Sequence, residues 1–465
     1  MIYISDRVHI FTFDSENILL DIHSGAIHLL SPLAYHIVCL WRDSGADLED
    51  LASFYDISAS DIPGASATES LEIISALKDL ADEGLLMSGA DELRDYQFPR
   101  DQVIKAICLH AAHDCNLRCE YCFAGEGAFG GDRSLMSFET GKRALDFLFN
   151  ASGSRVHVEV DYFGGEPLMN FDVVRRLIIY GEEESGRRGK VLTQTLTTNG
   201  VLLSDEAIAF LNARNVSLVL SLDGRPETHD RVRPTIGGRG SYDIVAPRIK
   251  AASRSGNGSS YYIRGTYTGY NKDFFEDARH LIEEGFSRIS LEPVVAPPEA
   301  RYAIREEDLP ELYRQYESLA RYYVNKWKQG EPFSFFHFNL DLEGGPCLPK
   351  RLSGCGAGYE YVAISPDGSI YPCHQFVGVS DFLMGNAREG ISNPDIGDLF
   401  RDSNLTRKSK CAVCWARYYC GGGCHANAYN HNRDLKEPYA IGCELEKKRL
   451  ELAMWIKAAY FPVEE

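Results

Sequence analysis

The sequence predicts an α/β protein in which a parallel sheet curls into a partial, TIM-like (β/α)6 barrel. Strand and helix patterns alternate six times between residues 101 and 330. Short connections between such units favour parallel strands with right-handed crossovers. The regions on either side do not follow this alternation, and 465 residues exceed one ordinary core, so we expect two or three domains.

Residues 1–95 are expected to form a separate small module with a winged-helix-like arrangement. Residues 8–13 and 18–22 alternate like strands, and 26–30 follow the turn signal Ser24-Gly25. Three helical patterns come next. They cover residues 32–41, 48–55 and 67–83. The polar residues 88–100 are expected to be a linker.

In the 101–330 region each predicted strand is followed by a helix. The six strands are expected at 103–110, 156–162, 191–197, 217–222, 261–268 and 288–295. The helices are expected at 138–150, 170–183, 204–215, 241–253, 271–285 and 306–329. Asn170, Ser204 and Asn271 are the expected N-caps of three of them. In a barrel of this kind the active-site residues lie at the C-terminal ends of the strands.

Thirteen cysteines are the most informative feature of the composition. The first residues have no signal-peptide pattern and no apolar run is long enough to span a bilayer, so we expect a cytoplasmic protein without membrane contact. A reducing compartment disfavours disulfides, and clustered cysteines there indicate metal. Cys39 and Cys108 stand in apolar runs and are expected in the core. A net charge of −19 argues against nucleic acid as a partner.

The first cysteine group directly follows the first predicted strand. Cys115, Cys119 and Cys122 have the spacing C-x3-C-x2-C, and Tyr121 precedes the third. Three thiolates on one loop can hold three irons of a 4Fe–4S cube and leave the fourth iron open to a ligand. Structural zinc, the rival interpretation, usually takes four ligands as two C-x2-C-like pairs, and no fourth cysteine is near.

This loop resembles that of the radical S-adenosylmethionine (SAM) superfamily. The resemblance implies that the open iron chelates the amino and carboxylate groups of SAM. It also implies that an electron from the cluster breaks the S–C5′ bond and releases a 5′-deoxyadenosyl radical. In such a site the cofactor carries the difficult chemistry, and the protein positions it.

Glycines and polar residues at the ends of the next strands are the candidate SAM contacts. The second strand ends in residues 164–167, Gly-Gly-Glu-Pro, which resemble the family's motif for the methionine amino group. The glycines permit close backbone approach, and Glu166 can accept from an ammonium. By resemblance, Ser221 and Asp223 lie near the ribose and methionine parts, while Arg233 suits the carboxylate. The expected contacts are Tyr121, Gly164, Gly165, Glu166, Thr198, Asn199, Ser221, Asp223 and Arg233.

The second cysteine group lies within residues 331–465, where periodicity weakens and glycine and cysteine become dense. C-x12-G-x4-C begins at Cys355, C-x2-C-x5-C-x3-C begins at Cys411, and a last cysteine stands at 443. This pattern resembles the SPASM domain of peptide-maturing enzymes. Together with Cys347 it supplies eight thiolates, enough for two further 4Fe–4S clusters. Paired zinc sites are the rival interpretation.

The resemblance also implies how these cysteines are divided, which with the first group makes three 4Fe–4S clusters. Auxiliary cluster I is expected on Cys355, Cys373 and Cys424, with either Cys347 or an open site as the fourth position. An open site would accept a substrate thiolate. Auxiliary cluster II is expected on Cys411, Cys414, Cys420 and Cys443. The glycines at 421–423 allow a tight turn between two ligands.

Longer stretches resemble the maturases of six-cysteine (SCIFF) peptides, namely residues 113–125, 133–136, 160–172 and 371–378. The implied reaction forms an intramolecular thioether in a ribosomally made precursor peptide. The radical removes hydrogen from a carbon, a cysteine sulfur joins that carbon, and an auxiliary cluster accepts one electron. No side chain is assigned as an acid or base. Residues 1–95 resemble an element that adds the leader peptide as a strand, and a flavodoxin- or ferredoxin-like protein is the expected electron donor.

Two other interpretations stay open. A maturase that oxidises a protein side chain, such as an anaerobic sulfatase maturase, would be expected to use a side-chain base and to lack residues 1–95. A non-enzymatic iron–sulfur protein for electron transfer or regulation would explain the cysteines and the winged-helix-like module. It would not explain the motif at 164–167, and it would need a basic helix face.

Overall fold

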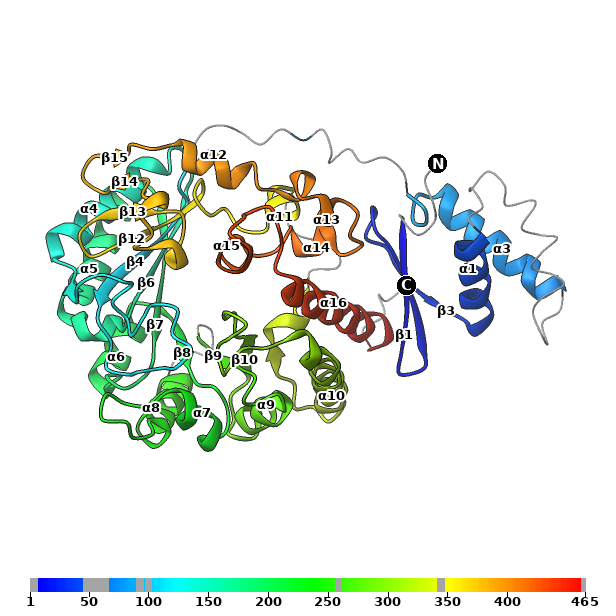
Figure 1. Ribbon diagram of the computed structural model, residues 1–465, viewed down its shortest axis with the longest axis horizontal. Coiled ribbons are helices and arrows are strands. Elements are labelled where there is room, and N and C mark those ends of the chain that lie inside the picture. The colour runs from blue at the N-terminus through cyan, green and yellow to red at the C-terminus, as the bar shows by residue number, and fades with distance from the viewer. Residues whose placement is uncertain are drawn as a thin grey trace.

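The centre of the protein is a mostly parallel sheet (Figure 1). The computed structural model describes residues 7–44, 67–88, 96, 103–255, 261–340 and 348–460. Six parallel strands lie side by side in chain order, as the sequence predicted. They are β4 (Ala106–His113), β6 (His157–Gly164), β7 (Val191–Thr198), β8 (Ser217–Ser221), β9 (Tyr261–Tyr267) and β10 (Arg288–Pro293). The short strand β11 (Ser334–Phe335) pairs with β10 and ends the sheet on that side.

Helices cover one face of these strands and bury its apolar side chains. On β6, Val158, Val160 and Tyr162 are fully buried in the main core, whereas the alternate residue Asp161 remains partly accessible on the other face. This two-residue period is what assigned the strand from sequence. The helices are α4 (Phe138–Ala151), α5 (Phe171–Arg187), α6 (Asp205–Ala213), α7 (Pro226–Val232), α8 (Tyr242–Ser255), α9 (Phe274–Glu283) and α10 (Leu309–Lys328). The predicted α/β class is therefore confirmed.

The predicted helix caps had mixed outcomes. Ser204 caps α6 as predicted, because its side chain accepts a hydrogen bond from a backbone N–H of the first turn. Asn170 is the N-cap residue of α5, but its side chain donates to the Ala111 carbonyl (2.9 Å) and so fastens the helix start to β4. The prediction for Asn271 was wrong, since the N-cap of α9 is Asp273.

The sheet continues into the C-terminal part of the chain, which the sequence did not predict. Strand β12 (Tyr361–Ile364) pairs in parallel with β4, and a meander of short antiparallel strands extends from it. These are β13 (Ser369–Tyr371), β14 (Gly385–Asn386) and β15 (Gly390–Ile391). The two-residue strand β5 (Ser134–Leu135) pairs with the end of β4. Cys373, which follows β13, is thus carried by the same sheet as the first cysteine loop after β4.

Short helices and one long helix complete the C-terminal part. They are α11 (Leu348–Ser353), α12 (Asp395–Arg401), α13 (Ser409–Ala412), α14 (Arg417–Cys420), α15 (His425–Asn432) and α16 (Ala440–Tyr460). Helix α16 packs on α10, where Arg449 donates two hydrogen bonds to the buried Tyr316 hydroxyl (2.7 and 2.9 Å). None of the described helices has both the length and the apolar character that a membrane crossing requires.

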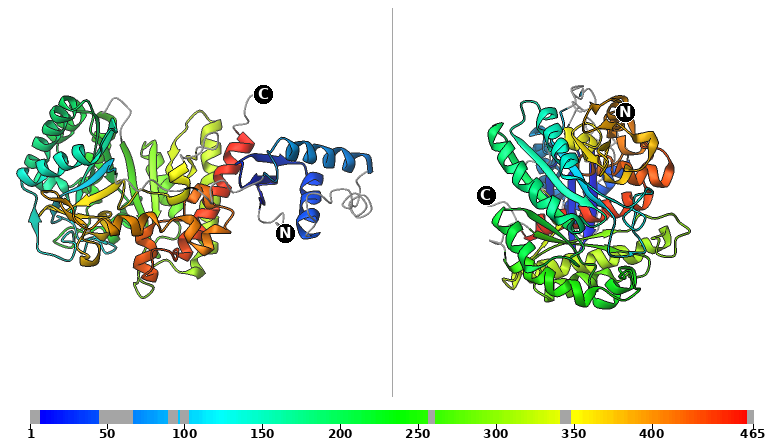
Figure 2. Two further views of the ribbon diagram at one scale, coloured as in Figure 1. Left: turned by 90° about the horizontal axis from the view of Figure 1, so that it is seen from above. Right: turned by 90° about the vertical axis from the view of Figure 1, so that its left-hand side faces the viewer.

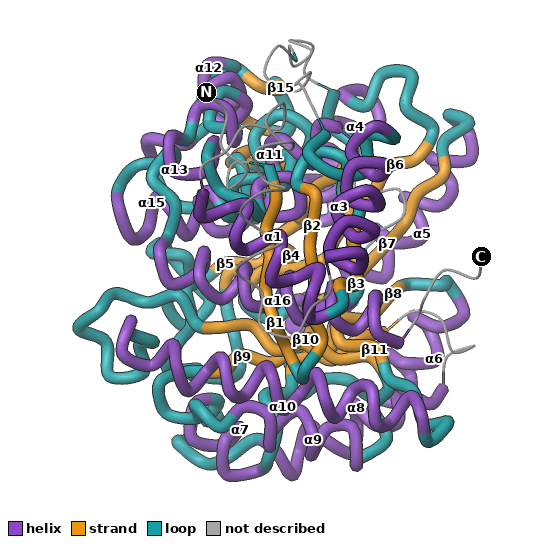
Figure 3. Tube along the Cα trace, turned by 90° about the vertical axis from the view of Figure 1, so that its right-hand side faces the viewer, coloured by secondary structure: helices purple, strands orange, loops and turns teal. Residues whose placement is uncertain are grey.

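A three-stranded antiparallel sheet at the N-terminus lies at one end of the molecule (Figures 2 and 3). It consists of β1 (Val8–Phe13), β2 (Glu16–Asp21) and β3 (Ile27–Leu30), followed by α1 (Pro32–Ser44) and α3 (Ala67–Asp82). Leu19 on one face packs with α1 and α3, while Ile18 and Leu20 on the other face join the main core. The predicted helix at 48–55 lies outside the described residues.

Aromatic contacts attach this sheet to the C-terminal part of the chain. The Phe13 ring packs edge-on against Trp455 of α16, with ring centroids 4.8 Å apart. The His9 ring stacks on Trp415 at 3.7 Å, and its Nε2 lies 3.0 Å from a carboxylate oxygen of Glu451. The sheet therefore has one face committed to α1 and α3 and the other to α16.

Candidate active site

The first cysteine group lies on the loop after β4, at the C-terminal edge of the sheet. The loop runs beside residues 232–235, because Arg118 N–H donates to the Pro234 carbonyl (2.8 Å) and Glu120 N–H to the Val232 carbonyl (2.9 Å). Cys115, Cys119 and Cys122 are all partly accessible on it. The three thiols therefore lie on one loop, which backbone hydrogen bonds hold against residues 232–235.

Polar N–H groups surround the Cys115 sulfur. Leu117 N–H lies 3.4 Å from it and Asn199 Nδ2 lies 3.6 Å from it. Asn116 Nδ2 is buried and has no hydrogen-bond partner among the described residues. N–H donors around cysteine sulfur are typical of iron–sulfur ligation, where they tune the cluster. The residues of this loop fit a cluster held by three thiolates.

Burial keeps the Cys115 and Cys119 thiols protonated while no metal is bound. It raises the pKa of Cys115 to about 12 and that of Cys119 to about 11. Metal binding requires thiolates, so cluster assembly on this loop must release protons. No group of three or more His, Cys, Asp or Glu side chains in the described part of the chain is arranged to hold a single metal ion. Cluster ligands bind different irons and so surround a volume instead of one point.

Two glycines allow the turn after β6 to approach the cysteine loop. A Cβ at Gly164, whose φ is +126°, would lie 2.2 Å from the Ala112 carbonyl oxygen, and a Cβ at Gly165 would lie 2.2 Å from that of Asp114. The sequence predicts that these glycines admit a ligand. The close approach in the structure is to the protein's own backbone, which brings the turn and the loop together.

Glu166 joins the ends of β6 and β7. Its buried carboxylate accepts hydrogen bonds from Leu168 N–H (3.0 Å), the Thr198 hydroxyl (2.8 Å) and Asn199 N–H (2.8 Å). Burial raises its pKa to about 7 although these donors oppose the shift. A carboxylate has about four lone-pair positions, so one acceptor position remains. Thr198 and Asn199, predicted as ligand contacts, thus also hold Glu166.

A buried ionic cluster lies beside the second half of the cysteine loop. The Asp223 carboxylate accepts from the Tyr121 hydroxyl (2.6 Å), from Arg233 Nε (3.0 Å) and from Thr266 N–H (3.0 Å). Asp223 and Arg233 are both nearly fully buried. The structure thereby brings together three of the predicted residues, while Ser221 ends the neighbouring strand β8.

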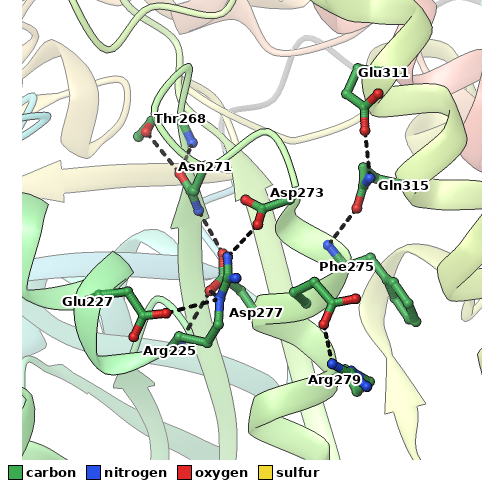
Figure 4. Close-up of polar contacts among 11 residues, drawn as sticks. Arg225, Glu227, Thr268, Asn271, Asp273, Phe275, Asp277, Arg279, Glu311 and Gln315 are labelled. Carbon is green, nitrogen blue, oxygen red and sulfur yellow. Dashed lines mark hydrogen bonds and ion pairs between the residues drawn. The ribbon is translucent and has the colours of Figure 1, made fainter.

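A second acidic residue, which the sequence analysis missed, supports the ends of β8 and β9 (Figure 4). Asp277 is fully buried on α9. It accepts from Arg225 Nε (2.8 Å) and from Asn271 Nδ2 (3.0 Å), and Asn271 in turn accepts from Thr268 N–H (2.8 Å). Asp277 shares the buried stripe of α9 with Phe274. The sequence did contain a signal for Asp277, namely a carboxylate at a helix position where the pattern calls for an apolar side chain.

Three cysteines from separate segments approach one another beside β12 and β13. Burial raises the pKa of Cys373, and the nearby thiols of Cys424 and Cys355 raise it further. The Cys355 sulfur also lies 4.0 Å from His425 Nδ1. Cys347, the predicted fourth member of this set, lies outside the described residues.

The other four cysteines of the C-terminal part also influence one another. Burial raises the pKa of Cys443 to about 11, and the thiols of Cys411 and Cys414 add to the shift. Burial likewise raises the pKa of Cys420 to about 12, with further contributions from Cys443 and Cys411. All three glycines at 421–423 have positive φ, between 65° and 89°, which a residue with a Cβ rarely adopts.

A buried lysine stands between the two sets of cysteines. Lys408 is almost fully buried, and its Nζ donates to the Gly422 carbonyl (2.7 Å). Burial lowers its pKa, and four thiols oppose that shift. The four are Cys411, Cys420, Cys424 and Cys355. A cation here would offset the negative charge of clusters on either side, and nothing in the sequence pattern identified it.

Comparison with known families agrees with this geometry. Residues 111–285 match the family model of the Radical SAM superfamily, and residues 355–415 match that of SPASM, an iron–sulfur cluster-binding domain. The protein is a radical SAM enzyme that carries a SPASM domain. Members of this superfamily bind SAM and a 4Fe–4S cluster, and SPASM domains bind additional iron–sulfur clusters.

Curated relatives include maturation enzymes of two kinds. A cysteine-type anaerobic sulfatase-maturating enzyme of Clostridium novyi (strain NT) is 26% identical over 350 residues, which are 68% of this chain and 86% of the relative. The antilisterial bacteriocin subtilosin biosynthesis protein AlbA of Bacillus subtilis (strain 168) is 25% identical over 347 residues, 70% of this chain and 69% of AlbA.

One solved structure shares the fold over almost the whole chain. Streptococcus suis SuiB bound to S-adenosylmethionine has a TM-score of 0.52 at 20% identity and covers 95% of this chain and 100% of its own. SuiB has also been solved bound to a precursor peptide, SuiA. The alignment therefore extends into the N-terminal sheet.

Proposed function

We propose that the protein installs intramolecular Cys-to-carbon thioether crosslinks in a ribosomally made, Cys-rich precursor peptide. Cys115, Cys119 and Cys122 would hold the SAM cluster. Bound SAM would supply a 5′-deoxyadenosyl radical that removes a hydrogen atom from the peptide. The protein's own task is to orient peptide and cofactor at the C-terminal edge of the sheet and to exclude water there.

We assign the SAM contacts to the residues at the C-terminal ends of the strands, according to the hydrogen-bonding groups that each residue still has available. Glu166 has one remaining acceptor position for the SAM ammonium. Arg233 uses Nε for Asp223, and its terminal nitrogens remain for the carboxylate of SAM. Asn199 lies beside Cys115 and so faces the same space. The remaining assigned contacts are Tyr121, Gly164, Gly165, Thr198, Ser221 and Asp223.

We assign the two cysteine sets of the C-terminal part to two auxiliary 4Fe–4S clusters, which makes three clusters in all. Auxiliary cluster I takes Cys355, Cys373 and Cys424, with Cys347 or an open position. Auxiliary cluster II takes Cys411, Cys414, Cys420 and Cys443. Thiols within each set shift one another's pKa, which supports this division. An external flavodoxin- or ferredoxin-like protein would supply the electrons.

The N-terminal sheet is the feature of the structure that most favours a peptide substrate. Within the described part of the chain β3 is hydrogen-bonded to a strand on one side only. A free strand edge beside a helix suits an added peptide strand, with main-chain hydrogen bonds giving affinity. Since its two faces are committed to other elements, the outer edges of β1 and β3 are what the sheet has left to offer in the described part of the chain, and of these we choose β3 because α1 packs beside it. We infer that residues 1–95 hold the leader, 101–330 form the catalytic barrel and 331–465 hold the auxiliary clusters.

Oxidation of a protein side chain is the second candidate. The likeness to the sulfatase-maturating enzyme of Clostridium novyi favours it. The two reactions differ in what happens to the cysteine sulfur. Oxidation of a cysteine to an aldehyde removes the sulfur, whereas thioether formation retains it. Mass analysis of the product separates the two.

The test is co-expression with a short Cys-rich peptide, to be sought among the reading frames beside the gene. We expect the peptide to lose two hydrogens for each crosslink, to keep all of its sulfur and to lose thiol reactivity toward an alkylating reagent. Co-expression with the C115A variant is the control and should leave the peptide unmodified. An unchanged mass with the active enzyme would refute the proposal, and loss of sulfur would favour the second candidate.

A further inference from the structure

On strands β6 to β10 the face of the sheet turned away from the helices carries several polar and accessible side chains, whereas Cys108 on β4 and Ala363 on β12 are buried. Barrel interiors are ordinarily filled by packed, branched apolar side chains. Here several side chains on this inner face are at least partly accessible, and Arg264 is 47% exposed. The accessible inner-face residues are Asp161, Thr195, Thr197, Ser221, Arg264 and Glu292. Polar groups that converge on an accessible surface are typical of a substrate-binding site.

Asp161 lies between the turn at residues 164–167, which is proposed to bind SAM, and the SPASM domain at residues 355–415. It precedes Gly164 by three residues on β6, and the next residue on the same face, Phe163, contacts the His374 ring at 5.3 Å. His374 directly follows the proposed cluster ligand Cys373. A peptide bound on this face would therefore lie within reach of both the turn and the auxiliary site.

The groups that face Asp161 come from every neighbouring strand. Thr197 of β7 donates a long hydrogen bond to its carboxylate (3.3 Å), and Arg264 of β9 stabilises its charged form. On the other side lie the Cys108 thiol of β4 and the Tyr361 hydroxyl of β12, and burial raises the pKa of both well above their usual range. Both are therefore neutral near pH 7. Burial also raises the pKa of Asp161 itself, to about 7.

The other carboxylate of this face is already engaged. Glu292 accepts from His337 Nε2 (2.9 Å) and lies 3.9 Å from Arg264. Burial alone would raise its pKa, but His337, Arg449 and Arg264 together hold the pKa of Glu292 well below its usual range. A carboxylate held in its charged form is a weak base. Asp161 is the better placed proton acceptor of the two.

We propose that Asp161 is the catalytic base that removes the proton from the substrate thiol before carbon–sulfur bond formation. The S–H bond breaks and an O–H bond forms on the Asp161 carboxylate. The sulfur then joins the carbon radical, and one electron leaves to an acceptor of the iron–sulfur class. The peptide thus loses one hydrogen atom, one proton and one electron, which together are two hydrogens. This assignment rests on the proposed function.

Asp161→Asn removes the base and nearly preserves the shape of the side chain. With the precursor peptide, we expect the variant to form 5′-deoxyadenosine and to take deuterium from labelled peptide as wild type does. Crosslinks formed per 5′-deoxyadenosine should fall by about 10²- to 10⁴-fold, the usual contribution of a positioned base. Glu159→Gln, an exposed residue two positions earlier on the same face, is the matched control and should behave as wild type.

The pH profile tests the role more specifically than a loss of activity does. Because the charged carboxylate is the base, the crosslink yield per 5′-deoxyadenosine should rise with pH and level off above about 7. Thr197 stabilises the charged form, so Thr197→Val should raise the pKa of Asp161 and move the inflection to higher pH. A merely structural aspartate would not produce this shift.

Several results would overturn the assignment. They are an unchanged crosslink yield in Asp161→Asn, equal losses of 5′-deoxyadenosine and crosslink in that variant, and an unmoved inflection in Thr197→Val. Infrared difference spectra of the peptide-free holoenzyme provide a separate test. The carboxyl band lost in Asp161→Asn should titrate near pH 7, and titration near pH 4 would contradict the proposal. If wild type never crosslinks the peptide, the proposed function fails while the infrared result still decides on Asp161.

Discussion

Replacing Cys119 with alanine is expected to abolish reductive cleavage of SAM. The cysteine loop supplies three thiols, and with two of them a cube has no stable hold on this loop. The iron content should fall by about one third of the wild-type value, because one of three proposed clusters is lost. Anaerobic incubation with SAM and dithionite, followed by mass-spectrometric measurement of 5′-deoxyadenosine, checks the activity.

Cys39 provides the matched control for this experiment. It lies on α1 in the N-terminal part of the chain and is not one of the proposed ligands. Cys39→Ala should keep both the iron content and the 5′-deoxyadenosine yield of wild type. Full SAM cleavage by Cys119→Ala would show that the loop after β4 does not hold the catalytic cluster.

A methyl group at position 165 is expected to separate the turn after β6 from the cysteine loop. The new Cβ would lie 2.2 Å from the Asp114 carbonyl oxygen, so the backbone must move. Overpacking of this kind costs about 1–3 kcal/mol in the free energy of unfolding. Since the displaced backbone leads directly into Cys115, Gly165→Ala should also lose most of its SAM cleavage. Urea unfolding and the 5′-deoxyadenosine assay measure the two effects.

Gly186 offers a comparison in which the same methyl group meets open space. It lies on α5, and a Cβ there would have no neighbour within 4 Å. Gly186→Ala should therefore keep wild-type activity and gain slightly in stability, because alanine favours the helix. If Gly165→Ala were as active and as stable as Gly186→Ala, the close contact between turn and loop would have no role.

The barrel strands were predictable because their residues alternate between two environments. Val158, Val160 and Tyr162 are buried under helices, and this period of two is visible in the sequence. The strands of the C-terminal part have two to four residues each, and two of them contain glycine. Segments this short do not show the two-residue alternation of buried and accessible side chains that identifies a strand in a sequence. The pairing of β12 with β4 joins residues far apart in the chain, which no local pattern can indicate.

The candidate site was predictable only where spacing alone defines it. The C-x3-C-x2-C loop and the glycine–glutamate turn are local patterns, and both are visible in the sequence. Asp277 and Lys408 were missed because their partners come from other elements of the fold. Asp161 was missed for the same reason, since the groups that face it come from four other strands, β4, β7, β9 and β12. The spacing of cysteines along the chain identifies cluster ligands, whereas the surroundings of a single side chain are known only once the sheet is assembled.

The loop after β4 is expected to bind a cluster that cleaves SAM. The most direct measurement is anaerobic incubation of the reconstituted wild-type protein with SAM and dithionite, without any peptide. We expect 5′-deoxyadenosine and methionine to accumulate in equal amounts. Unchanged SAM, with the iron and sulfide of all clusters still present, would contradict the claim.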